Sequence, residues 1–303
     1  MHHAIIDLGT NTCNLLIAST EGKQYEIIYD GKEGVKLGKE GINQNILTPD
    51  AFERATKAIS NHLQTINRYP VDEIIVIATS AVRDAVNRDE FASYIFEKTG
   101  LSLTIISGEE EAEYIFKGVQ LAFGELNNSL ILDIGGGSNE FILTQGNTSV
   151  WRRSFPIGMS RIISSFPISD PITNDEIQAI EEYFDKVLEP LWKRMHSVEI
   201  QQLIGCSGAF DTLADLVDNV PAASKFRVTQ YINIDDFNAV SEKIISSTTA
   251  QREKMASMEP LRIEMIVPSC IFMRFILNKL SITEIVQTGY SLKEGVLYTK
   301  INS

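Results

Sequence analysis

Two short turns carry residues whose types and spacing suit the binding of phosphate and a metal ion. The first turn reads Asp7-Leu8-Gly9-Thr10-Asn11-Thr12, and the second reads Asp133-Ile134-Gly135-Gly136-Gly137-Ser138. Glycines let a backbone approach a ligand closely, and successive N–H groups then form a concavity that binds anions. The aspartate that begins each turn can hold a hydrated Mg²⁺, which prefers oxygen ligands. The alternative interpretation of each segment is a strand-joining turn with a capping aspartate.

The two turns share one design. Each begins with Asp, an apolar residue and Gly, and each lies between two apolar segments that are typical of strands. A shift of 126 residues (133 − 7) brings Asp7 onto Asp133 and Gly9 onto Gly135. We interpret this as one hairpin used twice, which predicts two related lobes that face each other.

Glu111 is the candidate general base. It ends the run Glu109-Glu110-Glu111 in the first turn of an expected helix, where Ser107 and Glu110 have the spacing of a capping box. Capping and the helix dipole explain the first two acids. At about 100° per residue, Glu111 lies about 40° from Ile115, on the apolar face of the helix. A carboxylate at the edge of apolar packing suits a base that acts on water.

Two further candidate segments, a basic residue and a third turn, each follow an expected strand. Arg83 comes a few residues after the apolar run 74–78, near the place where α/β sheets bind ligands. Its guanidinium fork matches phosphate oxygens, and an exposed charge paired with Asp84 or Asp89 is the alternative. The turn Gly205-Cys206-Ser207-Gly208 suits either a second backbone cradle, for a distal phosphate or a nucleoside, or only a tight turn.

Competing nucleotide and nucleophile motifs are incomplete. A dinucleotide fingerprint needs glycine where the chain has Glu140, and a nucleophile elbow needs glycine where it has Ala209. The Gly-Lys pairs are followed by Gln or Glu, not by the Ser or Thr of a P-loop. With four histidines in the chain, neither a catalytic triad nor a His-rich metal site is indicated.

The elements that must position these residues alternate between strand and helix. Strands are expected at 73–78, 103–106, 202–205 and 285–286, and helices after caps at Thr48, Ser107 and Thr173 and over 263–280. This alternation predicts mixed sheets covered by helices, an α/β fold. The stretch 124–128 is the expected boundary between the lobes.

Composition limits the partners. The chain has 303 residues and a net charge of −13, which argues against nucleic acid as a partner. A polyanion can still bind where cations or backbone dipoles dominate locally. The three separated cysteines do not indicate a disulfide framework or a zinc site. No apolar stretch reaches the length of a membrane span and the N-terminus does not resemble a signal peptide, so a cytoplasmic protein is expected.

Seven segments together resemble the exopolyphosphatase/guanosine pentaphosphatase (Ppx/GppA) family. In family order from residue 4 to 298 they read AIIDLGTNTCNLLIA, KEGVKLGKEGI, ATSAVRDAVNRDEF, ISGEEEAEYIFKGV, LDIGGGSNEF, GCSGAFDTLA and GYSLKEGVLY. The resemblance implies the actin-like fold (acetate/sugar kinase/Hsp70/actin), with two ribonuclease H-like lobes and a cleft between them. The lobes are expected at 1–124 and 125–303, and packing of the last helix back on lobe I is left open.

The resemblance also implies roles for single residues. Glu111 looks like the family's catalytic base, with Glu140 as an assisting acid, and Arg83 looks like its phosphate-binding arginine. Asp7 and Asp133 resemble carboxylates that hold Mg²⁺, with Mn²⁺ as the alternative metal. The phosphate loops correspond to Gly9, Thr10, Asn11 and Thr12 in lobe I and to Gly135, Gly136, Gly137 and Ser138 in lobe II. Gly205, Ser207 and Gly208 are the expected distal substrate-binding residues.

Two positions depart from the family pattern. Family members often have Arg where this chain has Asn14 and Thr where it has Asn139, so charge neutralisation can differ. The chain also ends after GYSLKEGVLY, as the short, two-lobed members do, which weakens any expectation of processive action on long polymers.

The expected function is the release of terminal orthophosphate from inorganic polyphosphate by metal-assisted, in-line attack of water. Guanosine pentaphosphate hydrolysis is the second expectation. Two further functions stay open, an acceptor-dependent phosphotransferase of the same fold and a non-catalytic sensor. A polyanionic phosphate is the expected partner, neither nucleic acid nor membrane is expected as one, and the resemblance alone suggests a homodimer.

Overall fold

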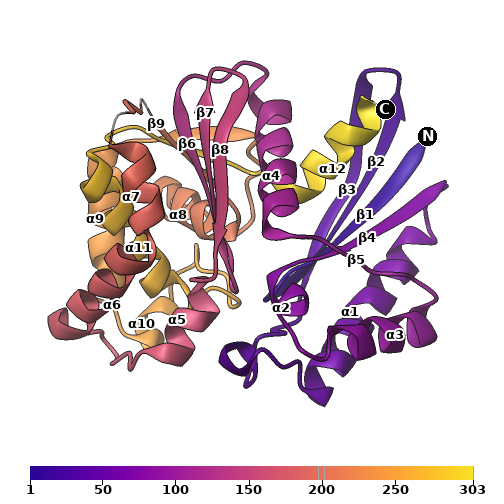
Figure 1. Ribbon diagram of the computed structural model, residues 1–303, viewed down its shortest axis with the longest axis horizontal. Helices are drawn as coiled ribbons and strands as arrows, with labels where there is room; N and C mark the ends of the chain where they lie inside the picture. The colour runs from indigo at the N-terminus through magenta and orange to yellow at the C-terminus, as the bar shows by residue number, and fades with distance from the viewer. Residues whose placement is uncertain (197, 201, 303) are drawn as a thin grey trace. The chain divides into compact units, whose positions relative to one another are not determined.

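The computed structural model describes residues 1–196, 198–200 and 202–302 (Figure 1). The chain divides into two compact units. Unit 1 comprises Met1–Leu121, Gly135–Gly137 and the segment from Tyr290 onwards, and unit 2 comprises Ala122–Ile134 and Ser138–Gly289. The expected boundary between the lobes, at residues 124 and 125, stays a prediction.

Unit 1 is built on a five-stranded mixed sheet. Its strands are β1 (His2–Leu8), β2 (Thr12–Glu21), β3 (Gln24–Gly34), β4 (Glu73–Ala78) and β5 (Thr104–Ile105), and they lie in the order β3-β2-β1-β4-β5. The pairs β1–β2 and β2–β3 are antiparallel, whereas β4 is parallel to both β1 and β5. The central strand β1 is apolar from Ala4 to Ile6 because both of its faces are buried.

Helices cover both faces of this sheet. They are α1 (Pro49–Ile66), α2 (Ser80–Arg83), α3 (Arg88–Thr99), α4 (Gly108–Phe123) and α12 (Leu292–Ile301), with a short 3₁₀ helix η1 (Ile42–Gln44). Figure 1 shows α1 and α3 on one face and α12 on the other. The predicted start of α1 is confirmed, because the Thr48 hydroxyl accepts a bond from the Ala51 N–H at 3.3 Å.

Unit 2 repeats the strand order of unit 1. Its strands are β6 (Ser129–Ile134), β7 (Asn139–Gln145), β8 (Thr148–Phe155), β9 (Gln202–Cys206), β10 (Thr229–Ile232) and β11 (Ile285–Thr288). They lie in the order β10-β11-β9-β6-β7-β8, so β8-β7-β6-β9-β11 corresponds to β3-β2-β1-β4-β5, with β10 as an added antiparallel edge strand.

The two hairpins also share one register. Asp7 lies opposite Asn14 in the first, and Asp133 lies opposite Glu140 in the second, so the same offset of 126 (133 − 7, 140 − 14) relates both partners. The prediction of one hairpin used twice is therefore confirmed, and so is the predicted actin-like fold class, with a mixed, helix-covered sheet of the same order in each unit.

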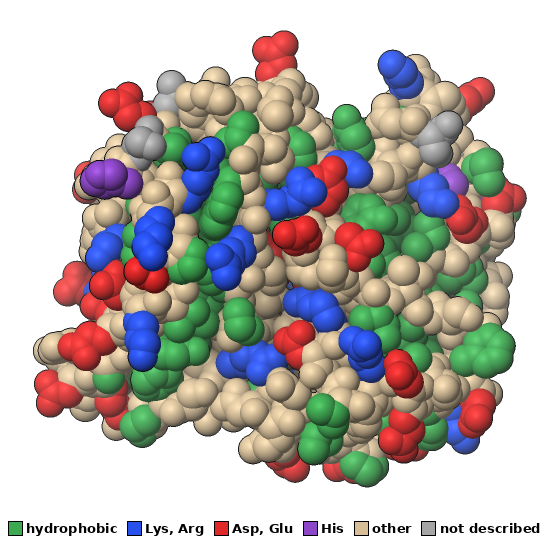
Figure 2. All heavy atoms as spheres, viewed as in Figure 1, with side chains coloured by type: hydrophobic (Ala, Val, Ile, Leu, Met, Phe, Trp, Pro, Cys, Tyr) green, Lys and Arg blue, Asp and Glu red, His purple; other side chains and the backbone are tan. Residues whose placement is uncertain are grey.

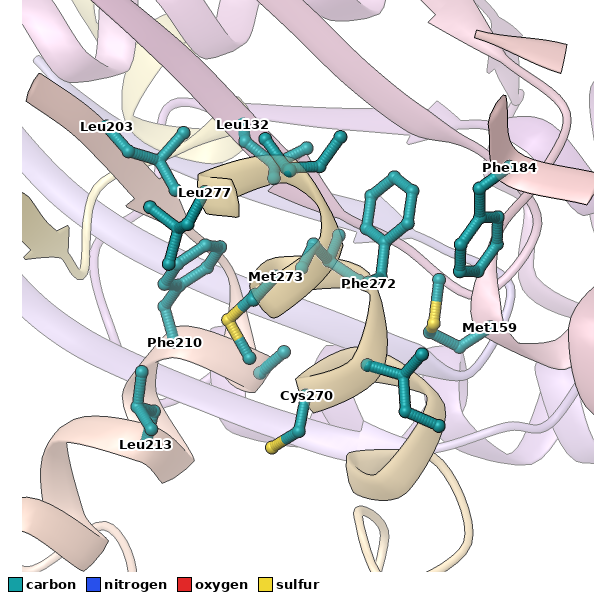
Figure 3. Close-up of a cluster of buried hydrophobic side chains, with 14 of the residues drawn as sticks. Leu132, Met159, Phe184, Leu203, Phe210, Leu213, Cys270, Phe272, Met273 and Leu277 are labelled. Carbon is teal, nitrogen blue, oxygen red and sulfur yellow. The ribbon is translucent and has the colours of Figure 1, made fainter. Parts of the chain in front are cut away.

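The core of unit 2 forms around helix α11 (Ile266–Leu280) (Figure 3). The surrounding helices are α5 (Met159–Ser165), α6 (Asn174–Val187), α7 (Glu189–Met195), α8 (Gly208–Asp218), α9 (Ile234–Ile245) and α10 (Thr249–Arg252). Figure 3 shows Met273 and Leu277 of α11 beside Phe210 of α8 and Leu203 of β9. Phe272 lies on the side of Phe184 from α6, with 4.7 Å between the ring centroids.

The prediction that this helix begins at residue 263 is wrong by three residues. The helix begins at Ile266, which places Pro268 in the first turn. There the missing N–H of proline has no helical partner to lose, whereas in the interior it would break the helix.

The predicted capping box of α4 and the predicted cap of α6 at Thr173 are both confirmed. The Ser107 N–H donates to Glu110 Oε2 at 2.8 Å and the Glu110 N–H donates to Ser107 Oγ at 3.2 Å, and Thr173 and Glu176 form the same pair of bonds. The Ser107 backbone N–H lowers the pKa of the Glu110 carboxyl. The Thr79 side chain, in contrast, makes no capping bond at α2.

Two further features concern the burial of the cysteines and the length and polarity of the helices. Cys13, Cys206 and Cys270 are buried thiols, and burial raises the pKa of the Cys270 thiol to about 12. Within the described part of the chain, none of the helices combines the length and the apolar character that crossing a bilayer requires.

Candidate functional site

The parallel strands of unit 1 bring three candidate segments to one edge of the sheet. Strands β1, β4 and β5 run parallel, so their carboxyl ends lie at the same edge. The Thr79 N–H donates to Leu8 O at 3.2 Å, and the Ile106 N–H donates to Ala78 O at 3.2 Å. The turn after β1, helix α2 after β4 and helix α4 after β5 therefore begin next to one another.

Arg83 and Glu111 meet at this edge. Arg83 Nη1 donates to Glu111 Oε2 at 2.6 Å, and the two side chains are only 16% and 10% exposed. Arg83 also reaches Asp84, its alternative partner, but at a longer 3.5 Å. The structure thus brings the predicted base and the predicted phosphate ligand into direct contact.

The three acids in the first turn of α4 differ in exposure as the helical period predicts. Glu109 and Glu110 are exposed, whereas Glu111 is buried with 8% of its surface accessible. The predicted inward orientation of Glu111 is confirmed, and its catalytic role stays a prediction.

The turn after β1 is fixed by backbone bonds. The Gly9 N–H donates to Thr12 O at 2.9 Å, and the Leu37 N–H donates to Thr10 O at 2.7 Å. Next to the turn, Asn14 Nδ2 donates to Asp7 Oδ2 at 2.9 Å. The residue that departs from the family pattern in β2 therefore contacts the predicted metal ligand as a neutral donor.

The turn after β6 contributes its glycines to unit 1. A Cβ atom on Gly137 would lie 2.5 Å from Ser80 Oγ and 2.7 Å from Thr10 Oγ1. These distances are too short for carbon, so a side chain at position 137 would force the two hydroxyl groups to move. Residues from the two predicted phosphate loops, Thr10 and Gly137, thus lie together. Ser80 was not predicted as their neighbour; its only signal was its place after a strand.

Two acids of unit 2 lie across one strand pair. Asp133 is 9% exposed and Glu140 is 1% exposed, and they occupy opposite positions of β6 and β7. Glu140 Oε1 accepts bonds from Ser138 Oγ and from Ser154 Oγ, each at 2.6 Å. Glu140 therefore fixes the last residue of the predicted phosphate loop. Ser154 on β8 had no signal in the sequence.

Asn139, the second departure from the family pattern, has a structural contact. It is fully buried, and its Nδ2 donates to Ile157 O at 3.1 Å.

The Gly205–Gly208 turn joins β9 to α8 under tight steric limits. Ser207 has a positive φ of 73°, and its hydroxyl donates to Ile134 O at 3.0 Å. A Cβ atom on Gly205 would overlap the Phe210 ring, at 2.1 Å from Cδ1. Packing against Phe210 therefore accounts for the absence of a side chain at position 205.

Gly208 lies against a cation that the sequence did not indicate. A Cβ atom there would come within 1.9 Å of Arg262 Nη2. The Arg262 side chain is 14% exposed, its Nε lies 3.9 Å from Glu259 Oε2, and this buried Nε has no hydrogen-bond partner among the described residues. A guanidinium against the first residue of a helix adds positive charge to the positive end of the helix dipole, and both features favour an anion.

Charge is mixed on the surface. Figure 2 shows acidic and basic side chains interspersed over the viewed face, although the net charge is −13. The described residues contain no cluster of three or more His, Cys, Asp or Glu that could hold a metal ion. Asp7 lies in unit 1 and Asp133 in unit 2.

Comparison with known proteins gives a consistent result. The model of the Ppx/GppA phosphatase family matches residues 16–303. A solved structure of an exopolyphosphatase from Cytophaga hutchinsonii is 36% identical, with a TM-score of 0.95, and the match covers 100% of this chain and 98% of that one.

Two sequence relatives extend this result. A bifunctional 3-dehydroquinate synthase/phosphatase from Fusobacterium nucleatum is 31% identical over 91% of this chain, which spans only 43% of that relative's length. A putative exopolyphosphatase from Haemophilus influenzae is 25% identical, and the match covers 98% of this chain and 90% of that protein.

Proposed function

This chain belongs to the Ppx/GppA phosphatase family, and from that membership we propose that it releases terminal orthophosphate from inorganic polyphosphate. The names of the Cytophaga and Haemophilus relatives support polyphosphate as the substrate. The observation that carries the proposal is the contact between Arg83 and Glu111 at the edge of the unit 1 sheet. This contact places a guanidinium that can bind phosphate beside a carboxylate that can accept a proton.

Arg83 and Glu111 act in sequence in this proposal. The terminal phosphate engages the Arg83 guanidinium, whose planar fork suits phosphate oxygens. This releases the Glu111 carboxylate to orient a water molecule and accept its proton. The water oxygen bonds to the terminal phosphorus as the P–O bond to the next phosphate breaks, which yields orthophosphate and a chain shorter by one phosphate.

The glycine turns bind the phosphate through backbone N–H groups. In unit 1 these are Gly9, Thr10, Asn11 and Thr12, and in the second turn they are Gly135, Gly136, Gly137 and Ser138. The close approach of Gly137 to Thr10 and Ser80 supports joint action of the two turns. Backbone dipoles of this kind stabilise the charge that develops on phosphate oxygens in the transition state.

Asp7 and Asp133 are proposed to hold Mg²⁺, with Mn²⁺ as the alternative. The donors fit, because Mg²⁺ commonly takes one or two carboxylates and completes its shell with water and substrate phosphate. The amide of Asn14 supports this role by orienting the Asp7 carboxylate without adding a competing charge. The Ppx/GppA family generally depends on a metal, and a bound ion would supply positive charge against the phosphate oxygens.

Glu140 and the third turn have supporting roles. Glu140 is proposed as an assisting acid that holds Ser138 in place through the hydroxyl bond. A distal phosphate of the polyphosphate substrate is proposed to bind at Gly205, Ser207 and Gly208. The Arg262 guanidinium, which lies against Gly208, supports an anion at this turn. We also propose that the protein is a cytoplasmic homodimer, as the family resemblance suggests. Sedimentation analysis would measure its oligomeric state.

One experiment separates the candidate functions. Phosphate release is measured with polyphosphates of graded length and with guanosine pentaphosphate, each with Mg²⁺ and with chelator. We expect metal-dependent release from polyphosphate without any acceptor. Preference for guanosine pentaphosphate would instead make the chain a 5′-phosphohydrolase of that nucleotide. Transfer only to an added acceptor would indicate a phosphotransferase, and tight binding without release would indicate a sensor.

A further inference from the structure

Two helices of unit 1 cross with their backbones in contact. A Cβ atom on Gly118 of α4 would lie 2.0 Å from Ser291 O, and one on Gly295 of α12 would lie 1.7 Å from Tyr114 O. Each glycine thus faces a backbone carbonyl of the opposite helix or of its capping residue. Carbon and oxygen atoms normally approach to about 3.5 Å, so any side chain at either position would push the helices apart.

The crossing lies on the same face of α4 as Glu111. Gly118 follows Glu111 by seven residues, which is about two helical turns, and at about 100° per residue the two positions differ by about 20° around the axis. The rotation of α4 about its axis therefore sets both the fit of Gly118 against α12 and the direction of Glu111. Gly118 is buried, in agreement with this placement.

Helix α12 is itself held to the sheet at several points. Lys293 Nζ donates to Asp30 Oδ2 on β3 at 2.8 Å and to the neighbouring Glu294 at 2.6 Å. Near the other end, Lys300 Nζ donates to Glu73 on β4 at 2.8 Å. The helix also packs against β1 and β2. It is therefore a fixed support against which α4 can be oriented.

Helix propensity alone does not account for glycine at these positions. Glycine in a helix interior is less favourable than alanine by about 0.5–1 kcal/mol. At Gly118 and Gly295 the absence of a side chain instead permits contact between the two backbones. Such a contact fixes the separation of two helices more tightly than side-chain packing, because no rotamer can change to relieve a displacement.

We propose that Gly118 and Gly295 are positioning residues, which fix the rotation and height of α4 so that Glu111 meets Arg83 and the attacking water. The proposal rests on the role given to Glu111 above. Sheet, α12, α4 and Glu111 form one continuous series of contacts. A displacement of α4 at the crossing would move the carboxylate without touching the glycine turns that bind phosphate.

The test is a double-mutant cycle with phosphate release from polyphosphate as the readout. Gly118→Ala and Gly295→Ala are each expected to lower kcat about 10- to 100-fold, since a displacement of about 1 Å commonly costs that much. KM should change little, because the phosphate ligands are intact. In a Glu111→Gln background the same substitutions should lower kcat by less than about threefold, because the base they position is gone.

Controls separate positioning from loss of structure. Lys117→Ala alters the adjacent residue of α4, which pairs with Glu113 at 3.3 Å, and should leave kcat unchanged. Circular dichroism and thermal denaturation establish that each variant is folded. If both alanine variants fail to fold, Lys293→Gln replaces them. It loosens α12 from β3 without a clash and should lower kcat severalfold only when Glu111 is present.

The outcomes distinguish this inference from the proposed function. Wild-type turnover by Glu111→Gln would remove the base and with it the positioning role. A slow Glu111→Gln enzyme beside folded glycine variants of wild-type kcat would overturn the positioning role alone. Equal losses from the glycine substitutions with and without Glu111 would also overturn it, because a purely structural defect is independent of the base.

Discussion

Replacement of Glu111 by glutamine removes the proposed base while it preserves the shape of the side chain. General base catalysis contributes about 10²–10⁴-fold, so kcat should fall by that factor, equivalent to about 2.7–5.4 kcal/mol in the activation barrier. The substitution also removes the charge from the 2.6 Å contact with Arg83. Because both side chains are largely buried, we expect the free energy of unfolding to fall by about 1–3 kcal/mol.

The effect on KM has a sign that the contact predicts. In the wild-type protein, phosphate must displace the Glu111 carboxylate from the Arg83 guanidinium. A neutral amide competes less, so KM for polyphosphate should stay the same or fall while kcat drops. A rise in KM with kcat unchanged would instead show that Glu111 serves binding.

The assay compares Glu111→Gln with a matched neighbour. Glu110→Gln changes an exposed acid in the same helical turn, and glutamine can keep the capping box with Ser107. Steady-state phosphate release should be near wild type in this control. The reasoning is refuted if Glu111→Gln turns over polyphosphate at the wild-type rate, or if both variants lose activity equally.

Three further predictions follow from single contacts. Arg83→Lys keeps the charge but loses the fork, so KM for polyphosphate should rise about tenfold or more in the same assay; an unchanged KM would exclude bidentate binding. Gly137→Ala places a carbon within 2.7 Å of two hydroxyl oxygens and should abolish most turnover in a folded protein, whereas wild-type turnover would mean that the loop relaxes freely. Lys225, followed by Arg227, lowers the pKa of Asp218 to about 2, so this site stabilises the fold fully above about pH 4 and loses that contribution as the pH falls towards 2. Asp218→Asn should flatten that part of the acid denaturation curve, and an unaltered curve would contradict the assignment.

Local patterns predicted much of the fold. The two Asp-x-Gly turns revealed a repeated hairpin because strand, turn and strand are adjacent in sequence, and its register confirmed the repeat. The helical period placed Glu111 on the buried face, since periodicity depends only on spacing. The start of α11 was misplaced because Ile263 and Met265 extended the apolar pattern towards the N-terminus, although Pro268 is typical of a first helical turn.

Contacts between segments that lie far apart in the chain could not be predicted from the sequence. Arg83 and Glu111 were each singled out, but their pairing depends on the parallel arrangement of β4 and β5. The guanidinium of Arg262 against Gly208 depends on a turn that carries no motif. Glycine within a helix, as at Gly118, gives no sign of the backbone that it faces.

The most direct test of the account follows the oxygen of the attacking water. Polyphosphate of defined length is hydrolysed in ¹⁸O-labelled water with Mg²⁺, and the released orthophosphate is analysed by mass spectrometry. Water attack on the terminal phosphorus predicts one ¹⁸O atom in each released orthophosphate and chains that shorten by one phosphate at a time. Label in the shortened chain instead of the orthophosphate, internal fragments, or no release without an acceptor would contradict it.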